Sequence, residues 1–117
     1  MAFDVQSTHR PFKVAISIPA NTDNDGKGTK LSDLIGPIGR GKIGIRISAN
    51  QPAVTTDRAA FLTASPRQGA AIAATDFTTH GEYHEAGEEW QEPSDTADEL
   101  YVRSADGNAV PALAIVY

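Results

Sequence analysis

Two short segments alternate between apolar and polar residues, and this alternation constrains the fold more than any other feature of the chain. Residues 12–18 (FKVAISI) and 42–48 (KIGIRIS) each carry a large apolar side chain at every second position; in the second segment these are Ile43, Ile45 and Ile47. A period of two places such side chains on one face of an extended strand and leaves the other face wetter. We therefore expect both segments to be strands of an antiparallel sheet.

The C-terminal residues carry the strongest local signal for paired strands. Residues 100–104 and 109–117 are rich in apolar and β-favouring residues, and Asp106-Gly107 lies between them. An Asp-Gly pair favours the tight turn of a β-hairpin, so we predict a hairpin here. Pro111 lacks an amide proton and is expected at a strand start or an edge position. Both faces of residues 109–117 are apolar, which predicts that this last strand is covered on both sides.

Shorter segments complete the predicted architecture. Residues 31–35 fit one helical turn, residues 54–64 fit either strand or helix, and residues 70–74 favour a strand because β-favouring residues follow them. Short strands, frequent turn signals and the lack of a long helical period are typical of an all-β fold; we predict an antiparallel, jelly-roll-like β-sandwich. Residues 1–11 are predicted to form an extended N-terminal arm, and residues 12–117 a single domain.

Composition excludes several functional classes. The chain has 117 residues, no Cys and a formal net charge of −5. Without Cys it is not a disulfide scaffold, a thiol enzyme or a Cys-ligated zinc module. Net acidity argues against nucleic-acid binding, which depends on neutralising phosphates. No apolar run approaches the ~20 residues of a membrane helix, and the N-terminal residues do not resemble a signal peptide.

The charge is segregated along the chain. Residues 1–75 hold nine basic and five acidic residues, whereas residues 76–99 hold nine acids and neither Lys nor Arg. Residues 100–117 are neutral overall. Nine acids so close together repel one another unless positive charge opposes them. Three sources of that charge are considered: the basic half of the same chain, a neighbouring copy, or a bound cation.

Three residues form the best candidate for chemistry. If residues 77–84 were a strand, His80, Glu82 and His84 would share one face and could hold a divalent metal. The group resembles the first histidine motif of cupins only loosely, because the His-x-His core is missing. A metal-binding, cupin-like β-barrel enzyme is therefore one alternative function. The other interpretation is a polar strand face turned to water.

Two further motifs are incomplete. Asn21, Asp23, Asp25 and Gly26 have the spacing of a calcium loop, but position twelve is Ser32 and not a carboxylate. Asp23 and Asp25 are thus weak metal candidates. Residues 36–42 match G-x-x-x-x-G-K, yet the residue that follows is not the Ser or Thr that a phosphate loop needs. We interpret this stretch as a glycine-rich connection.

Nothing in the chain indicates nucleophilic catalysis or a cofactor. No serine lies in a G-x-S-x-G elbow. Trp90, the lone Trp, fits either a core or edge aromatic or an interface anchor. Trp90 and Tyr101 as stacking platforms would suit a second alternative, a carbohydrate- or receptor-binding β-sandwich.

The C-terminal third resembles small structural proteins of tailed bacteriophages. The resemblance is carried by a Trp in an acidic loop at residues 89–93, by residues 98–107 (DELYVRSADG), and by the apolar ending at 109–117. Chains of this kind are capsid decoration or cement proteins. The resemblance implies a non-enzymatic β-sandwich or jelly-roll subunit of the virion, which oligomerises on the capsid surface and stabilises it.

The same resemblance implies specific partners. They are the major capsid protein and further copies of the chain, in a homo-oligomer for which a trimer is one option. A protein with this role would be made in the host cytoplasm and then join the capsid surface. The extended arm and the apolar last strand would supply the contact surface, and the candidate interface residues are Phe3, Arg10, Phe12, Trp90, Tyr101 and Tyr117.

Overall fold

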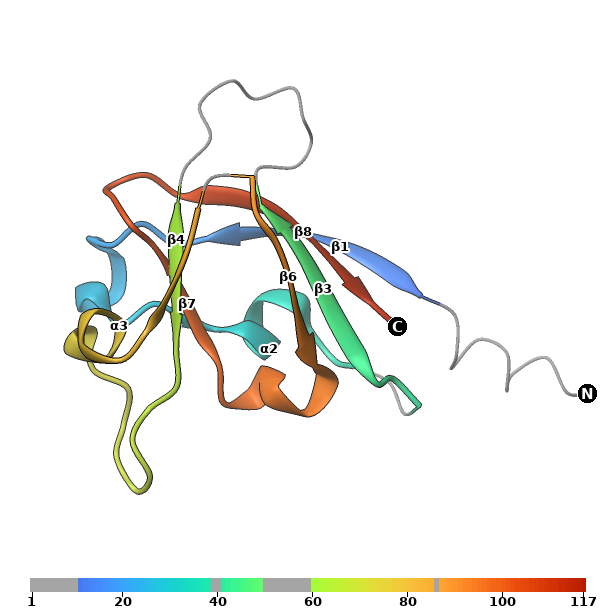
Figure 1. Ribbon diagram of the computed structural model, residues 1–117, viewed down its shortest axis with the longest axis horizontal. Helices are drawn as coiled ribbons and strands as arrows, with labels where there is room; N and C mark the ends of the chain where they lie inside the picture. The colour runs from blue at the N-terminus through green and yellow to red at the C-terminus, as the bar shows by residue number, and fades with distance from the viewer. Residues whose placement is uncertain (1–10, 39–40, 50–59, 86) are drawn as a thin grey trace, which may run out of the picture.

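The computed structural model describes residues 11–38, 41–49, 60–85 and 87–117, and it forms two four-stranded antiparallel sheets that pack face to face (Figure 1). Sheet A has the strand order β1 (Phe12–Ile18), β8 (Val110–Val116), β3 (Gly44–Ala49), β6 (Glu89–Pro93). Sheet B has the order β2 (Thr29–Lys30), β7 (Tyr101–Ser104), β4 (Phe61–Ala64), β5 (Glu82–His84). The predicted all-β antiparallel sandwich is therefore confirmed.

The predicted arm and part of the ambiguous segment lie outside this description. Of the arm at 1–11, only Pro11 is described, and it is exposed. Of residues 54–64, those before Ala60 lie outside the described residues. The remainder forms β4, so this end of the segment is a strand.

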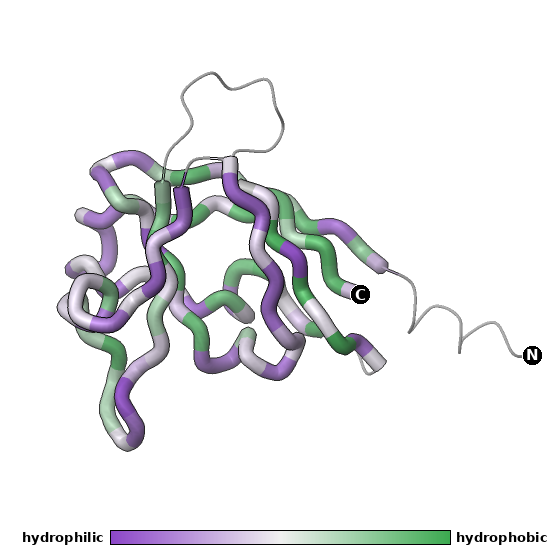
Figure 2. The backbone as a smooth tube through the Cα atoms, viewed as in Figure 1, coloured by the Kyte–Doolittle hydropathy of each residue, from purple (hydrophilic) through white to green (hydrophobic). Residues whose placement is uncertain are grey.

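The hydrophobic core lies between the two sheets. In sheet A, cross-strand pairs such as Ile45 with Val116 and Ile47 with Ala114 turn inward, and all four side chains are fully buried. Green stretches follow β8 and β1 in Figure 2. The core cluster consists of Ile16, Ile18, Leu31, Ile35, Ile45, Ile47, Phe61, Trp90, Ala97, Leu100, Val102, Val110, Ala112, Ala114 and Val116. The alternation in the two predicted strands is thus explained by burial of one face.

The second predicted strand differs from the structure at its first residues. Strand β3 begins at Gly44, and the side chain of Ile43 is 74% exposed. The backbone N–H groups of both Ile43 and Gly44 donate to the carbonyl oxygen of Tyr117, at 2.7 and 2.9 Å. Ile43 and Gly44 therefore both lie opposite Tyr117, as two residues lie opposite one in a β-bulge. This irregularity turns the Ile43 side chain away from the core.

Four short helical segments connect the strands. The predicted helical turn is α2 (Leu31–Ile35), and both of its end residues are buried in the core. Two 3-10 turns, η1 (Asp23–Gly26) and η2 (Ser94–Asp98), add to it. The helix α3 (Ala74–Thr79) follows a coil at 70–73, so the strand predicted for residues 70–74 is wrong.

Capping and burial explain the helix α3. The Asp76 carboxylate accepts the backbone N–H of Ala73 at 2.9 Å and so satisfies a donor at the start of the helix. Phe77 is 1% exposed. The Arg103 guanidinium lies 4.9 Å from the centre of the Phe77 ring. These contacts outweigh the β propensity of the threonines in this segment.

The predicted C-terminal hairpin is also wrong. Strands β7 and β8 belong to different sheets, so the connection around Asp106-Gly107 crosses from one sheet to the other. The backbone N–H of Ser104 donates to Pro19 at 2.7 Å, and that of Asn21 donates to Asp106 at 2.9 Å. These hydrogen bonds connect the turn to the loop that follows β1. The two strands on either side of the turn do not pair with each other.

Strand β8 is covered on one face only within the described part of the chain. Its inward residues are buried, whereas Leu113, Ile115 and Tyr117 on the outer face are half-buried. The predicted cover on both sides is therefore not present there. Pro111, the second residue of β8, is exposed and pairs with Ser17, while pairing with β3 extends only to Ala112. This agrees with the position predicted for Pro111.

None of the helices in the described ranges is both long enough and apolar enough to cross a membrane.

Candidate functional site

The edge of the sandwich formed by β5 and β6 holds the most unusual group of side chains. His84 on β5 is 1% exposed. Its Nδ1 lies 2.5 Å from Oε2 of Glu88, and its Nε2 lies 3.0 Å from Oγ1 of Thr63 on β4. An ionised carboxylate only accepts hydrogen bonds, so Nδ1 donates its proton to Glu88, while Nε2 is within hydrogen-bond distance of the Thr63 hydroxyl. Both ring nitrogens are therefore satisfied inside the protein.

Aromatic rings enclose the same imidazole and connect the two sheets. Phe61 of sheet B stacks on His84 at 4.7 Å between ring centres, with an angle of 20° between the planes. Trp90 of sheet A stacks on it at 5.0 Å and 21°. Trp90 is 8% exposed, and its buried Nε1 has no hydrogen-bond partner. His84 thus bridges the sheets through ring contacts.

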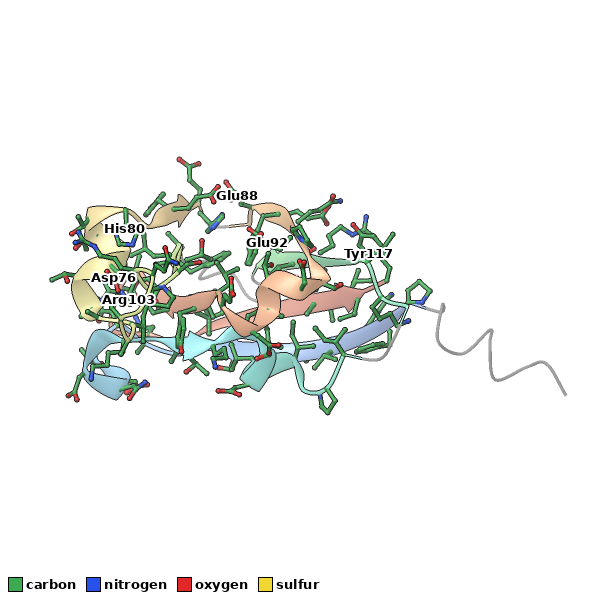
Figure 3. All side chains as sticks on the ribbon, turned by 90° about the horizontal axis from the view of Figure 1, so that it is seen from below. Asp76, His80, Glu88, Glu92, Arg103 and Tyr117 are labelled. Carbon is green, nitrogen blue, oxygen red and sulfur yellow. The ribbon has the colours of Figure 1, made fainter. Side chains whose placement is uncertain are left out.

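Two more carboxylates turn toward this edge. Glu92 pairs with Ile45 and Glu82 pairs with Thr63, so both lie on the inward sides of their strands. Burial raises the pKa of Glu92 above its usual value, the charge of Glu82 raises it further, and His84 opposes the rise. Figure 3 labels Glu88, which directly precedes β6, and Glu92, which lies within it. The edge therefore concentrates negative charge around one histidine.

The Thr63–His84–Glu88 series has the order of a nucleophile, a base and an orienting acid. Its geometry does not suit catalysis, because Thr63 is 2% exposed and the hydroxyl is enclosed with the imidazole. The arrangement satisfies buried polar groups and fixes β4 against β5 and β6. We assign it a structural role.

The predicted metal ligands do not come together. Residues 77–79 are helical, and His80 is the C-cap of α3, where its Nε2 lies 3.2 Å from the Ser65 carbonyl oxygen. Glu82 is exposed and His84 is enclosed in the core. The described ranges contain no group of three or more His, Asp or Glu that fits a metal ion. Glu82 and His84 do share the inward side of β5, but His80 lies outside that strand, so the predicted face of three ligands is wrong.

The calcium-like loop is built as a tight turn. Asn24 and Asp25 have positive φ angles of 51° and 55°, and the Asn24 side-chain amide donates to the Gly28 carbonyl at 2.8 Å. The Arg103 guanidinium donates to the Gly26 carbonyl at 2.9 Å. The positively charged Arg103 side chain thus hydrogen-bonds to one backbone oxygen of this loop. In the described chain, Asp23 and Asp25 do not belong to any group of three or more His, Asp or Glu that could hold a metal ion.

The described residues of the glycine-rich stretch, 36–38 and 41–42, border a groove. The groove has a volume of about 720 Å³ and lies between these residues, α2 and η2. Asp33, Asp95 and Asp98 line it together with Lys42. The strand β3 follows this stretch, so the helix that a phosphate loop requires is not there.

The candidate interface residues have different environments. Phe3 and Arg10 lie outside the described residues. Phe12 is half-buried on the inward side of β1, with Nζ of Lys42 5.3 Å from its ring centre. Tyr101 is half-buried, with Nζ of Lys30 5.9 Å from its ring centre. Trp90 is a core residue, so it serves neither as an exposed anchor nor as a stacking platform for a sugar.

Tyr117 is the candidate that lies on an open surface. The outer face of sheet A carries cross-strand rows, one of which is Lys13–Ile115–Arg46–Gln91. The Tyr117 ring lies over Gly44, where an added Cβ would approach it to 2.6 Å. A side chain at position 44 would therefore displace the Tyr117 ring. The apolar row along β8 continues to Tyr117 and the exposed Ile43 beside it.

Sequence reasoning missed two exposed apolar side chains. Among described residues, Ile43 at 74% and Tyr83 at 58% are the large hydrophobics that remain exposed. The bulge that exposes Ile43 has no local sequence signal. Tyr83 alternates with Glu82 and His84, and this alternation was available as a sign that Tyr83 faces away from His84.

The segregated charges do not neutralise one another within the described part of the chain. The salt bridges there are His80–Asp76 and His84–Glu88, and neither involves Lys or Arg. Lys13 and Arg46 lie on the outer face of sheet A, and the Nε of Arg46 is buried without a partner. Leaving Lys42 aside, the described Lys and Arg residues of the basic half therefore provide no ion pair to the acids at 76–99.

Comparison with protein-family models finds no match for this chain, and neither the curated proteins nor the solved structures include one that matches it.

Proposed function

We propose that this protein is a capsid decoration or cement subunit of a tailed bacteriophage. In this role it catalyses no reaction. It binds the major capsid protein on the capsid surface and stabilises the particle as a homo-oligomer. The resemblance of residues 89–117 to such proteins suggests the role, and the distribution of charge supports it.

The observation that carries the proposal is the unneutralised charge. Residues 76–99 hold nine acids, and among the described Lys and Arg residues other than Lys42 none forms an ion pair with them. Repulsion within such a segment lowers the stability of an isolated subunit. A subunit of a charged lattice gains from the same arrangement, because complementary patches set orientation and register between neighbours.

The winding of the strands gives further support. Strands β1 and β8, β2 and β7, β3 and β6, and β4 and β5 are hydrogen-bonded neighbours. We interpret this as a long antiparallel ribbon rolled into two sheets, which is a jelly roll. Jelly rolls occur in viral capsid proteins, in lectins and in cupins. Of these three, the virion role is the one that the charge distribution favours.

A sedimentation experiment tests the proposal. Purified chain is mixed with heads of the phage that encodes it, prepared without this protein, and pelleted through a sucrose cushion. We expect the chain to pellet with the heads in a fixed ratio to the major capsid protein. Raising NaCl from about 0.05 to 0.5 M shortens the screening length severalfold and is expected to release it. The proposal is wrong if the chain stays in the supernatant at every salt concentration.

A matched pair of variants identifies the source of the salt effect. Asp95→Asn/Asp98→Asn removes two exposed charges of the acidic segment. Asp23→Asn/Asp25→Asn removes two exposed charges outside it. We expect the first pair to weaken the dependence of head binding on salt and the second to leave it unchanged. If the two double variants showed the same salt dependence, the acidic segment would not be the source of the salt effect.

A further inference from the structure

We propose that copies of this chain associate head to tail, with Tyr83 and the nearby exposed Glu85 docking on the outer face of sheet A of the next copy. The inference rests on the proposed homo-oligomer and assigns the two surfaces that form it. The receiving surface, here called the Tyr117 hollow, is lined by Ile43, Gly44, Gln91, Glu92, Pro93 and Tyr117.

The Tyr117 hollow is shaped to receive a single large side chain. It has a volume of about 340 Å³ and is open to solvent. The Tyr117 ring and the exposed Ile43 supply apolar walls. Glu92 contributes to the lining from β6, while its pairing with Ile45 places its side chain on the inward side of the strand. An exposed apolar surface of this kind marks a contact site.

A cation without a partner stands beside the hollow. Arg46 is two residues from Gly44 on the same face of β3, and it pairs across the sheet with Ile115 and Gln91. Neither Arg46 nor Lys13, in the same row, forms an ion pair among the described residues. The surface around the hollow thus combines apolar side chains with positive charge, which suits an aromatic residue that has an acid close to it.

Strand β5 presents that combination. Tyr83 pairs with Leu62, so it lies on the outer side of sheet B, and it is 58% exposed. Glu85, two residues further along the chain, is exposed and forms no ion pair among the described residues. Glu82 lies on the inward side of β5 and does not belong to this surface. Tyr and Arg are the side chains that most often carry binding energy at protein interfaces, and here one lies on each surface.

The two surfaces lie too far apart to meet within one molecule. In Figure 1, β5 is the gold strand beside β4, and β3 begins at the opposite side of the sandwich. Figure 3 places Tyr117 toward one end of the long axis and His80, two residues before β5, toward the other. The contact is therefore heterologous, so each copy offers one free surface of each kind. Such contacts continue until a ring closes, and they give species larger than a dimer.

Charge-exchange variants test the inference by sedimentation velocity of the full chain, without phage heads. For the wild type we expect species larger than a dimer. Arg46→Glu and Glu85→Lys are each expected to raise the dissociation constant about tenfold or more, since like charges then face one another. Mixing the two variants, or combining the changes in one chain, is expected to restore association. Arg67→Glu and Glu99→Lys make the same kinds of change at exposed positions outside both surfaces and are expected to have no effect.

Several results would overturn the inference. They are a monomeric or strictly dimeric wild type at about 100 μM, surface variants that associate like the wild type, or mixtures that do not recover. If Arg46→Glu loses head binding but keeps its oligomeric state, the hollow receives the capsid and not a second copy. Association as expected, combined with a chain that never pellets with heads, would instead reject the proposed function and keep the inference.

Discussion

The middle of sheet A and the β5–β6 edge hold the two sheets together by different physical means. In the middle of sheet A, inward positions such as Ile45, Ile47 and Ala114 are aliphatic and fully buried. At the β5–β6 edge, the inward residues include His84 and Glu92, and their contacts are hydrogen bonds, ring stacking and charge. Apolar burial depends little on pH, whereas a carboxylate or an imidazole changes its charge. Changes at the two places should therefore differ in size and in pH dependence.

The largest effect is expected at the centre of sheet A. Ile47 is fully buried and pairs with Ala114 on one side and Trp90 on the other. Ile47→Ala removes buried methyl groups and leaves a cavity, so we expect it to lower the free energy of unfolding by about 4 kcal/mol. Urea unfolding at several pH values measures this loss, which should be the same at each pH.

Ile43→Ala is the matched control for this change. Ile43 is 74% exposed, and the loss should stay below about 0.5 kcal/mol. Equal losses for the two isoleucines would mean that Ile43 is covered in solution, for instance by another copy. The measurement is therefore made at a protein concentration below that of self-association.

A smaller loss is expected at the β5–β6 edge. His84→Ala removes a ring stacked on Phe61 and Trp90 and leaves Thr63 and Glu88 without their partner. We expect it to lower the free energy of unfolding by about 2–3 kcal/mol. His84→Phe keeps the stacking and should recover part of this loss.

His80→Ala serves as the control for the histidine. The His80 side chain is 38% exposed, and its contacts are a carbonyl oxygen and a carboxylate 3.7 Å away. The expected loss is below about 0.5 kcal/mol. If His84→Ala were as mild as His80→Ala, the edge would not depend on the imidazole, and the contrast with sheet A would be lost.

The two regions also differ in how far the sequence predicts them. Two strands of sheet A, β1 and β3, were predicted because burial of one face leaves a period of two in residues 12–18 and 42–48. Strand β6 was not, because residues 89–93 were interpreted as an acidic loop. The helix α3 was not predicted, because its threonines favour strands. The contacts that stabilise it, made by Phe77 and Asp76, form only in the folded protein. In the same way, Asp106-Gly107 indicates a turn but not which sheet the next strand joins, which depends on Pro19 and Asn21.

The candidate site was predicted in part. The acidic segment was evident in the sequence, and it carries the proposed function. The environment of His84 was not, because Thr63 comes from a strand 21 residues away and Trp90 from the opposite sheet. Periodicity identifies the face of a strand, but it does not identify which strand lies opposite.

The smallest effect is expected for Glu92, and its sign is opposite to the others. The pKa of Glu92 is raised in the folded protein, mainly by burial and then by Glu82. A raised pKa favours the protonated form on folding, so its stabilising contribution is present below the pKa of the unfolded chain, ~4.3, and is lost as the pH rises through the raised value. At neutral pH the ionised carboxylate therefore opposes folding.

Glu92→Gln should raise the free energy of unfolding at pH 7 by less than about 1 kcal/mol, because solvent screens this half-buried group. At a pH below about 4 the gain should vanish, because the wild-type carboxyl is then neutral as well. Thermal unfolding of both proteins across this pH range measures the difference, and Glu99→Gln at an exposed position is the control. A gain that persists at low pH would assign the effect to packing and not to charge, and the β5–β6 edge would then resemble the middle of sheet A.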